Sequence, residues 1–275
     1  MRVIRIPYDA FIRFLVDDGW AIASHIALST LMSLFPFLIV VTALAGFFGT
    51  KEISDQVAQL MLDAWPKEVA TPIAGEINDV LTTSRGGVLT IGLVFALYFS
   101  SNCVESLRIG LNRAYAQKET RNWAVLRLES IGYVLIGAIA MIALAFLVVL
   151  GPLLFFAALK YLPWLEPLET TFTFARLGIA TLVLVVALVL VHKWLPVGRR
   201  SFFEIAPGVI ITLALWLVAG VAFGRYLSEF ASAYTRTYAG LSSAMIALVF
   251  LYWTASIFVY GGELNAAIQS ARQKQ

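Results

Sequence analysis

Four polar residues between positions 102 and 112 have the types and the spacing that could do chemistry: Asn102, Glu105, Arg108 and Asn112. Glu105, Arg108 and Asn112 are separated by three and four residues, so a helix places all three on one face. A carboxylate, a guanidinium and a carboxamide on one face can hold a polar substrate, and they can equally pair with one another.

A second polar group follows two glycines near the C-terminus, where the chain reads Tyr260-Gly261-Gly262-Glu263-Leu264-Asn265-Ala266. Paired glycines let another helix backbone approach closely. We therefore expect Glu263 and Asn265 to lie beside a neighbouring helix, and we expect Glu263 to meet Arg108.

The elements that must position these residues are membrane helices. Hydrophobic residues make up 60% of the chain and charged residues 13%, which excludes a large soluble domain. Residues 20–50 contain no Asp, Glu, Lys or Arg. About 20 apolar residues are enough for a helix to cross roughly 30 Å of hydrocarbon, so this segment can span a bilayer.

Ionisable groups at membrane depth cost about 2.5–3.5 kcal/mol each, so they usually face the bundle interior and find partners. Two interpretations of the polar residues follow. Either they form an ion-pair and amide network that locks helix ends together, or they line a polar vestibule for a substrate.

The apolar stretches predict an all-α fold, a polytopic membrane bundle of about six transmembrane helices that forms a single integral membrane domain over 1–275. The expected spans are 20–48, 87–104, 130–158, 175–195, 204–226 and 240–265. The second is the weakest, because its apolar run is short and meets Glu105 and Arg108.

Positive charge predicts the orientation of these spans. Thirteen Lys and Arg residues fall on the side that would hold both termini and seven fall on the other side. Loops rich in Lys and Arg stay in the cytoplasm, so both termini are expected there.

The segment 51–85 is the longest external loop in this topology. Apolar residues recur in it at three- and four-residue spacing on either side of Pro66, which predicts a pair of amphipathic helices. We expect either a lid on the outer face of the bundle or a surface that docks a partner or gates a substrate.

Two backbone features complete the prediction. Ser33 precedes Pro36 in the first span, and this pair is a candidate hinge, since hydroxyls can satisfy a carbonyl that a proline frees. Gly220 and Gly224 have GxxxG spacing, which supports close contact between helices.

Enzyme motifs are missing from the sequence. We find no phosphate loop, no HExxH, no GxSxG and no Cys/His ligand spacing, so we predict no catalytic residue, no metal site and no cofactor. His25 and His192 are far apart, each near a predicted cytoplasmic end, and we expect both to be interfacial rather than ligands. The basic loop from Arg108 to Arg127 follows from the positive-inside bias, so we expect no nucleic acid partner.

Several motifs resemble the YihY/BrkB family of bacterial inner-membrane proteins. They are Ala27-Leu28-Ser29 through Ser33-Leu34-Phe35-Pro36-Phe37, Asn112-Arg113-Ala114-Tyr115 with Arg121, Trp194-Leu195-Pro196 before Arg199, Pro207-Gly208, Tyr238-Ala239-Gly240-Leu241, and Tyr260 to Ala266. The resemblance covers nearly the whole chain, with Gly261-Gly262 where Gly-Ala is expected. It implies six helices in the cytoplasmic membrane and no established activity; the ribonuclease BN label sometimes given to the family conflicts with the missing catalytic residues.

Two classes of function remain for such a protein. One is a transporter or flippase-like protein for an amphipathic or lipid-linked substrate, with a polar path built from Asn102, Glu105, Arg108, Asn112, Glu263 and Asn265 and gated at Pro36. The other is a non-transporting scaffold that docks an envelope protein through 51–85. Membrane lipids are partners in both.

Overall fold

The computed structural model describes residues 2–48, 88–147, 151–238 and 241–273, and every regular element in these ranges is a helix. The all-α prediction is confirmed there. The helices are α1 (Arg2–Val16), α2 (Gly19–Phe48), α5 (Val88–Ala114), α6 (Trp123–Ala145), α7 (Gly151–Tyr161), the 3-10 helix η2 (Pro163–Leu168), α8 (Glu169–Trp194), α9 (Phe202–Tyr238) and α10 (Ser242–Gln273). The segment expected to form the external helical pair, 51–85, lies outside the described residues.

Five segments of the described chain are long and apolar enough to cross a membrane. They are Gly19–Val41, Trp123–Ala145, Trp164–Trp194, Phe202–Phe230 and Ser242–Gln273. The remaining expected span, 87–104, corresponds to the first part of α5, which is not among these five; the second half of α5 carries Glu105, Arg108 and Arg113.

The helices differ from the expected spans in several places: α8 begins earlier, at Glu169, α9 and α10 end later, at Tyr238 and Gln273, and one expected span is divided between two helices. The segment expected as one span, 130–158, contains most of α6, which begins at Trp123 and ends at Ala145, and part of α7, which begins at Gly151. Asn122 fixes the earlier start, because its side chain accepts a hydrogen bond from the backbone N–H of Ala124 as an N-cap.

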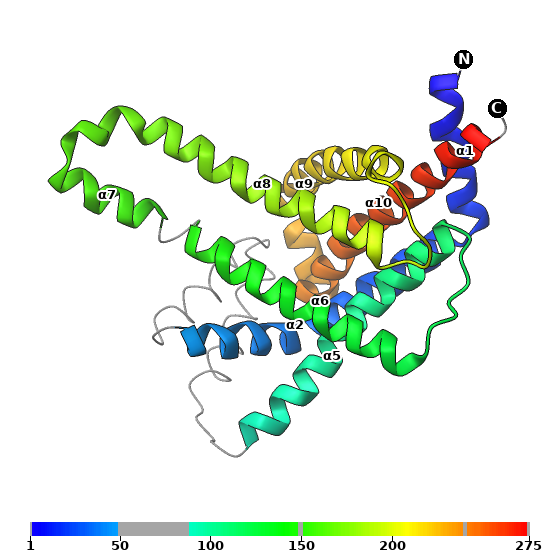
Figure 1. Cartoon of the computed structure of the whole chain (residues 1–275), viewed down its shortest axis with the longest axis horizontal. Coiled ribbons are helices and arrows are strands. Elements are labelled where there is room, and N and C mark those ends of the chain that lie inside the picture. Colours follow the sequence, from blue (N-terminus) through cyan, green and yellow to red (C-terminus); the bar gives the residue numbers. More distant parts are fainter. Residues whose placement is uncertain (1, 49–87, 148–150, 239–240, 274–275) are drawn as a thin grey trace.

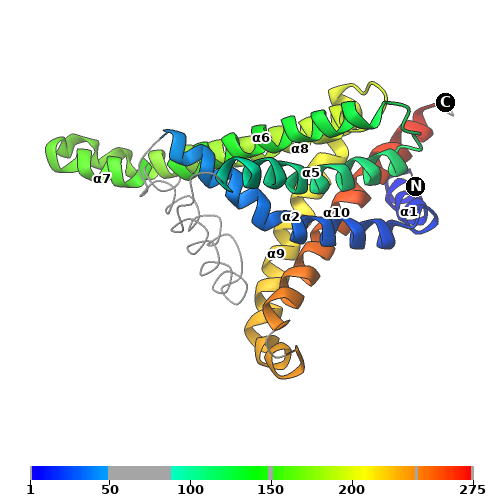
Figure 2. The same cartoon turned by 90° about the horizontal axis from the view of Figure 1, so that it is seen from below.

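The bundle is built around α2, which packs against α1, α5, α6 and α10 (Figure 1). The long helices α9 and α10 form a hairpin that diverges from α2, α5, α6 and α8 at its far end (Figure 2). At the extreme of the molecule away from the two chain ends, α7 and the start of α8 form an arm in which Phe155 stacks on Phe172 at 4.6 Å between ring centres (Figure 1).

Two apolar clusters hold the helices together. One contains Leu38 and Val41 of α2 with Ile246 of α10, and the other contains Ile26 of α2 with Leu111 of α5 and Val259 of α10. Since α2 and α10 contribute to both clusters, they form the central pair along most of their length.

Glycines set the contacts of α10 at its polar end. A Cβ added to Gly261 would overlap Thr212 of α9 and lie 3.0 Å from the Gly208 carbonyl oxygen. A Cβ on Gly262 would lie 3.2 Å from Ala114 of α5. The expectation that this glycine pair admits a neighbouring backbone is confirmed at Gly261, where the backbone of α9 approaches; at Gly262 the nearest atoms are side chains of α5.

The second glycine prediction finds no support among the described residues. Apart from the adjoining backbone of α9, no described atom lies within 4 Å of a Cβ built on Gly220 or Gly224. GxxxG spacing leaves one helix face free of side chains, but it does not determine whether another helix arrives there.

Helix α1 is an element that the sequence interpretation missed, because it counted the N-terminal arginines only as loop charges. Its last residue, Val16, is separated from α2 by Asp17 and Asp18, and Asp18 has a positive φ of 57°. The chain turns there, and α1 runs across the direction of α2 and beside the end of α10 (Figure 1).

Candidate functional site

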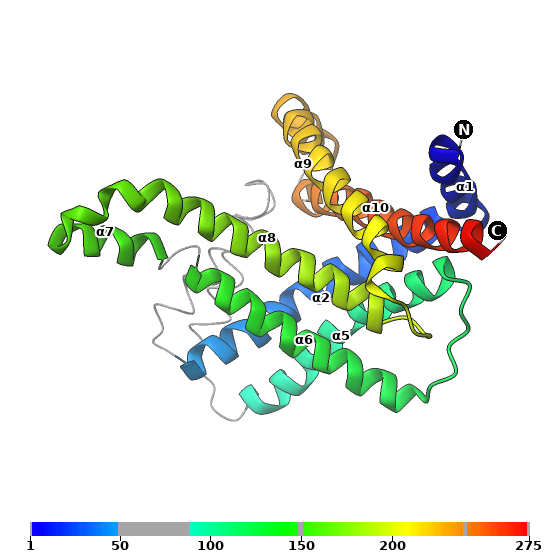
Figure 3. The same ribbon diagram turned by 45° about the horizontal axis from the view of Figure 1, so that its top comes forward.

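The buried charged and amide side chains of the described chain lie at one end of the bundle, which we call the terminal end. It holds both chain ends and the loops 115–122 and 195–201 (Figure 3). Three groups of residues lie there, on α5 and α6, between α5 and α10, and between α1 and α10.

Arg108 is the centre of the first group. Its side chain is 2% exposed, and its Nη1 donates to Glu105 Oε2 at 2.8 Å. Its Nη2 lies 3.5 Å from Glu129 Oε2 on α6. Glu105 also accepts a hydrogen bond from Ser130 at 2.7 Å. The predicted pairing of Glu105 with Arg108 is therefore present, and α6 completes it.

The network continues into both loops of the terminal end. Arg121 Nη1 lies 2.9 Å from Glu129 Oε2. Its Nη2 lies 2.8 Å from Glu119 Oε2 and donates to the Leu195 carbonyl at 3.1 Å. Asn112 donates to Glu119 at 3.1 Å and accepts from the Val197 N–H at 2.8 Å. We call Glu105, Arg108, Asn112, Glu119, Arg121 and Glu129 the Arg108 network. It ties α5 and α6 to the two loops.

Arg121 has a clear electrostatic effect on its partner. Its hydrogen bonds to Glu119 hold the pKa of that carboxyl well below its usual value, at about 2. Glu119 correspondingly raises the pKa of Arg121. Both groups stay charged at neutral pH, which suits a fixed ion pair rather than a proton carrier.

Asn102 belongs to a separate contact. Its Oδ1 accepts from Arg127 Nη1 at 2.9 Å, and the same nitrogen donates to Ser101 Oγ at 2.6 Å. The guanidinium of Arg127 also lies 4.3 Å from the centre of the Tyr98 ring. Asn102 therefore fastens α5 to α6 away from Glu105 and Arg108.

Asn265 lies in a second buried group, between α5 and α10. It is fully buried, its Oδ1 accepts from the Gly208 N–H at 2.7 Å, and its Nδ2 donates to Tyr115 Oη at 3.1 Å. His192 Nδ1 lies 3.3 Å from the same hydroxyl. The expected interfacial position of His192 is wrong, since its side chain is 0% exposed.

Arg200 covers this group from the 195–201 loop. Its guanidinium carbon lies 3.7 Å from the centre of the Tyr115 ring. Burial lowers the pKa of Arg200, and burial raises the pKa of Tyr115 to about 12. Among the described residues, Arg200 Nη1 and His192 Nε2 are buried without a hydrogen-bond partner. These two nitrogens could therefore make hydrogen bonds that no described residue provides.

Glu263 does not meet Arg108. Its side chain is 1% exposed, and its Oε2 lies 3.4 Å from Nε of Arg13 on α1. Arg13, whose side chain is 32% exposed, also donates to Ser270 Oγ at 3.1 Å. Arg108 is already held by Glu105 and Glu129, so its positive charge is neutralised locally.

Arg13 is a residue that sequence reasoning missed. One signal was available: Arg5, Asp9 and Arg13 recur every four residues among apolar residues, which is typical of an amphipathic helix. Its contact with Glu263 spans 250 positions and had no local signal.

The candidate hinge residues lie on α2 in the interior of the bundle. Ser33 is 4% exposed and donates to the Phe99 carbonyl of α5 at 3.0 Å, while Pro36 lies inside α2. The hydroxyl thus ties α2 to α5. Movement at Pro36 stays a prediction.

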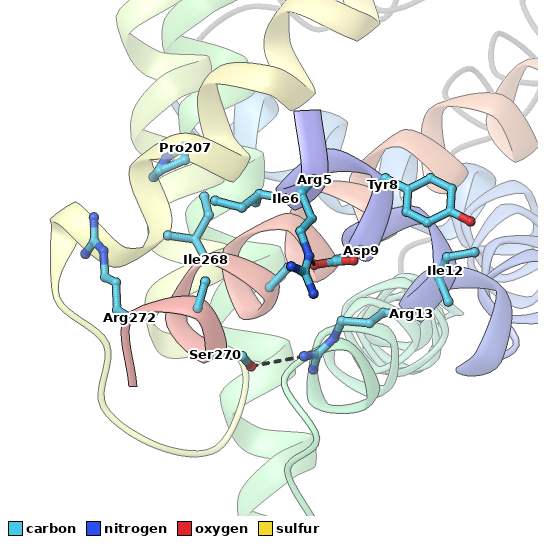
Figure 4. Close-up of a pocket in the computed structure, with 12 residues that line it drawn as sticks. Arg5, Ile6, Tyr8, Asp9, Ile12, Arg13, Pro207, Ile268, Ser270 and Arg272 are labelled. Carbon is cyan, nitrogen blue, oxygen red and sulfur yellow. Dashed lines mark hydrogen bonds and ion pairs between the residues drawn. The ribbon is translucent and has the colours of Figure 1, made fainter. Parts of the chain in front are cut away.

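A pocket of about 1020 Å³ opens beside the Arg13–Glu263 pair. Figure 4 shows Arg5, Asp9 and Arg13 reaching from α1, and Ile6 facing Ile268 of α10. Pro207 of α9 and Arg272 of α10 line its other side. Charged and apolar side chains thus share one opening. In the part of the chain that the structure describes, no group of three or more His, Cys, Asp and Glu side chains could hold a metal ion.

Known proteins are similar to this chain over almost its entire length. Residues 10–275 match the family described as Virulence factor BrkB. A ribonuclease-like protein of Bacillus subtilis, YfkH, is 24% identical over 96% of this chain and 95% of its own length. A UPF0761 membrane protein of Rhodospirillum centenum is 26% identical over 94% of this chain, and one of Chromohalobacter salexigens is 25% identical over 99%.

The two UPF0761 proteins are longer, and the match spans 56% and 65% of their lengths. No solved structure matches the chain. The relatives' names and the five candidate spans support the predicted location, a multi-pass protein of the bacterial inner membrane. The chain belongs to the BrkB family of membrane proteins.

Proposed function

We propose that this protein transports an amphipathic, lipid-linked substrate, which it binds in the pocket between α1, α9 and α10. The observation that carries the proposal is the position of Arg13. Its side chain lines the pocket and also contacts the buried carboxylate of Glu263, so a ligand in the pocket has a direct connection to the bundle interior.

The proposed topology has six spans with both termini in the cytoplasm. α5 is the second span in chain order, and a helical pair in 51–85 lies outside. Two observations support it. The terminal end gathers both chain ends and two loops (Figure 3), and those segments together with the adjoining ends of α5, α6 and α8 carry thirteen of the 20 Lys and Arg residues, the bias expected of a cytoplasmic face.

Competition for Arg13 provides the mechanism. An anionic group in the pocket attracts Arg13 and weakens its 3.4 Å contact with Glu263. A buried carboxylate without its partner is unfavourable, so helix α10 or α1 must move or Glu263 must take up a proton. The sequence contains no nucleotide-binding motif, so an ion gradient or the substrate's own gradient supplies the energy.

We propose that the protein is not an enzyme. A ribonuclease needs groups that converge on a phosphate in an aqueous cleft. His25 is exposed on α2 and His192 is buried against Tyr115. The ribonuclease-like name of YfkH thus corresponds to no such histidine arrangement in this chain.

A scaffold is the second candidate, and the Arg108 network favours it. Each of its six residues contacts at least two other groups, and Arg108 contacts two carboxylates. Such a network makes the terminal end rigid. In this alternative the protein docks an envelope partner through 51–85.

Reconstituted vesicles separate the two functions. The probe is fluorescent phosphatidylglycerol, whose movement between leaflets is followed by quenching of the outer leaflet with dithionite. We expect the wild-type protein to accelerate the movement and Glu263→Gln to abolish the acceleration. Glu166→Gln, which changes an exposed carboxylate of η2, is the matched control and keeps the wild-type rate.

Wild-type protein that moves the probe no faster than empty vesicles would contradict transport of this lipid class. Equal rates for Glu263→Gln and wild type would remove Glu263 from the mechanism. If the wild-type protein does not accelerate lipid movement but still binds an envelope protein, the scaffold function is supported.

A further inference from the structure

The surface of α1 divides into three faces. Ala10 and Phe14 are buried, and Ala10 packs against Leu264 and Ala267 of α10. A second face carries large apolar side chains that are 39–63% exposed: Tyr8, Phe11, Ile12 and Leu15. Arg5, Asp9 and Arg13 form the third, polar face, because they are four residues apart.

The position of α1 explains its uncovered apolar face. Asp17 and Asp18 alone separate α1 from α2, whose segment Gly19–Val41 can cross a membrane. In Figures 1 and 2, α1 runs across the direction of α2. A helix with one apolar and one charged face that is tied to the start of a span lies in the membrane interface, with its apolar face toward the acyl chains.

The pocket joins the polar and apolar faces. Tyr8 and Ile12 line it from the exposed apolar face, and Arg5, Asp9 and Arg13 line it from the polar face. A ligand in the pocket therefore contacts lipid-facing and water-facing side chains at once. That arrangement matches the boundary between the headgroup and the acyl chains of a lipid.

The charge of the pocket selects an anion. Three arginines line it with one carboxylate, Asp9, and since Arg13 is paired with Glu263, Arg5 and Arg272 supply most of the available positive charge. Asp9 offsets little of the positive charge of Arg5. Their contact is 3.7 Å long, and the side chains of Asp9 and Arg5 are 52% and 81% exposed. A guanidinium presents several donors in a plane that fits two oxygens of a phosphate. The volume, about 1020 Å³, is ample for a headgroup.

We infer that this pocket binds the phosphate headgroup of an anionic phospholipid, whose acyl chains follow the Tyr8, Phe11, Ile12 and Leu15 face of α1. The inference rests on the proposed function and gives the pocket its ligand class. Arg5 and Arg272 hold the phosphate from opposite sides, and Arg13 lies between the ligand and Glu263.

Binding is measured on the purified full-length protein in a neutral detergent, from the rise in unfolding temperature as lipid is added. The probes are phosphatidylglycerol, phosphatidylcholine and inorganic phosphate. We expect phosphatidylglycerol to stabilise the protein at far lower concentration than the other two. The double variant Arg5→Gln/Arg272→Gln should weaken phosphatidylglycerol binding roughly tenfold or more, because charge-assisted hydrogen bonds to the phosphate are lost.

Both arginines in this variant are exposed, so the fold does not depend on them. Arg199→Gln, which changes an exposed arginine in the loop 195–201 outside the pocket, is the matched control and should bind as the wild type does. An unchanged affinity in the double variant would overturn the inference. Equal stabilisation by inorganic phosphate would assign the pocket to a free anion and overturn the lipid assignment.

This measurement is independent of transport. Binding of phosphatidylglycerol without movement between leaflets would refute the proposed transport and keep the lipid site. Movement without arginine-dependent binding would refute the lipid site and keep the transport.

Discussion

Replacing Gly208 by alanine tests the crossing of α9 and α10 at the terminal end. A Cβ on Gly208 would overlap the Gly261 carbonyl oxygen and the side-chain amide of Asn265. The backbone of α10 cannot yield without moving the helix. The Asn265 side chain can move only by giving up its 2.7 Å hydrogen bond from the Gly208 N–H.

Two terms set the size of the effect. Overpacking a close contact costs about 1–3 kcal/mol. Leaving a buried polar group such as Asn265 Oδ1 unsatisfied costs a further 1–3 kcal/mol or so. We therefore expect Gly208→Ala to lower the free energy of unfolding by about 2–6 kcal/mol. Gly224→Ala has open space around its new methyl group and should change it by no more than about 1 kcal/mol.

Thermal unfolding of purified variants in one detergent measures this difference. At roughly 2–4 °C per kcal/mol, Gly208→Ala should unfold at least about 4 °C below wild type. The unfolding temperature of Gly262→Ala should lie between those of the other two variants, because its methyl group would lie 3.2 Å from the side chains of Leu111 and Ala114, which can shift. Equal unfolding temperatures for Gly208→Ala and Gly224→Ala would refute the close crossing.

Two further predictions concern the Arg108 network. Arg108→Met should destabilise the protein by about 3–5 kcal/mol in chemical unfolding, because Glu105 keeps a partly buried charge without its ion partner. Adding Glu105→Gln should recover part of this loss. A double variant no more stable than Arg108→Met would contradict the pairing of Glu105 with Arg108. The pKa of Glu119, held at about 2 by Arg121, means that the stability from this pair is complete above pH 4.5, the ordinary pKa, and is lost as the pH falls from 4.5 to 2. Unfolding temperature measured across that range should fall less in Glu119→Gln than in wild type, and parallel curves would count against the pair.

Local sequence features predicted most of the long helices, though not α1, and a contact within one of them. The uncharged run after Gly19 is long enough to define α2, because a membrane helix depends mainly on length and apolarity. Glu105 and Arg108 pair as predicted, because residues three apart on a helix are neighbours whatever the fold.

Contacts between distant segments could not be predicted in the same way. Glu263 had several basic residues available at the terminal end, and the choice of Arg13 depends on how α1 turns at Asp18 and packs on α10. His192 was expected at an interface because its segment ends there. It is buried because the loop 195–201 folds back over Tyr115, which a hydropathy pattern does not show.

The glycines show the same limit in another form. Gly261 and Gly262 admit different helices, while Gly220 and Gly224 admit none of the described chain. Small residues permit a close approach in all four positions. The side chains around them decide the outcome: at Gly208 the amide of Asn265 adds a hydrogen bond across the crossing.

The two charged groups of the terminal end differ in how firmly they are held. Arg108 is almost fully buried and joined to two carboxylates, one at 2.8 Å, within a network that includes both loops. Glu263 is as deeply buried but has a 3.4 Å contact with Arg13, whose side chain is one-third exposed and lines a pocket. A charge that must exchange partners during transport should have the weaker and more accessible contact, and a charge that fixes helix positions should have the stronger one. The proposed movement therefore belongs to α1 and α10 at the Arg13–Glu263 contact, while α5, α6 and the loops around Arg108 form the fixed frame against which they move.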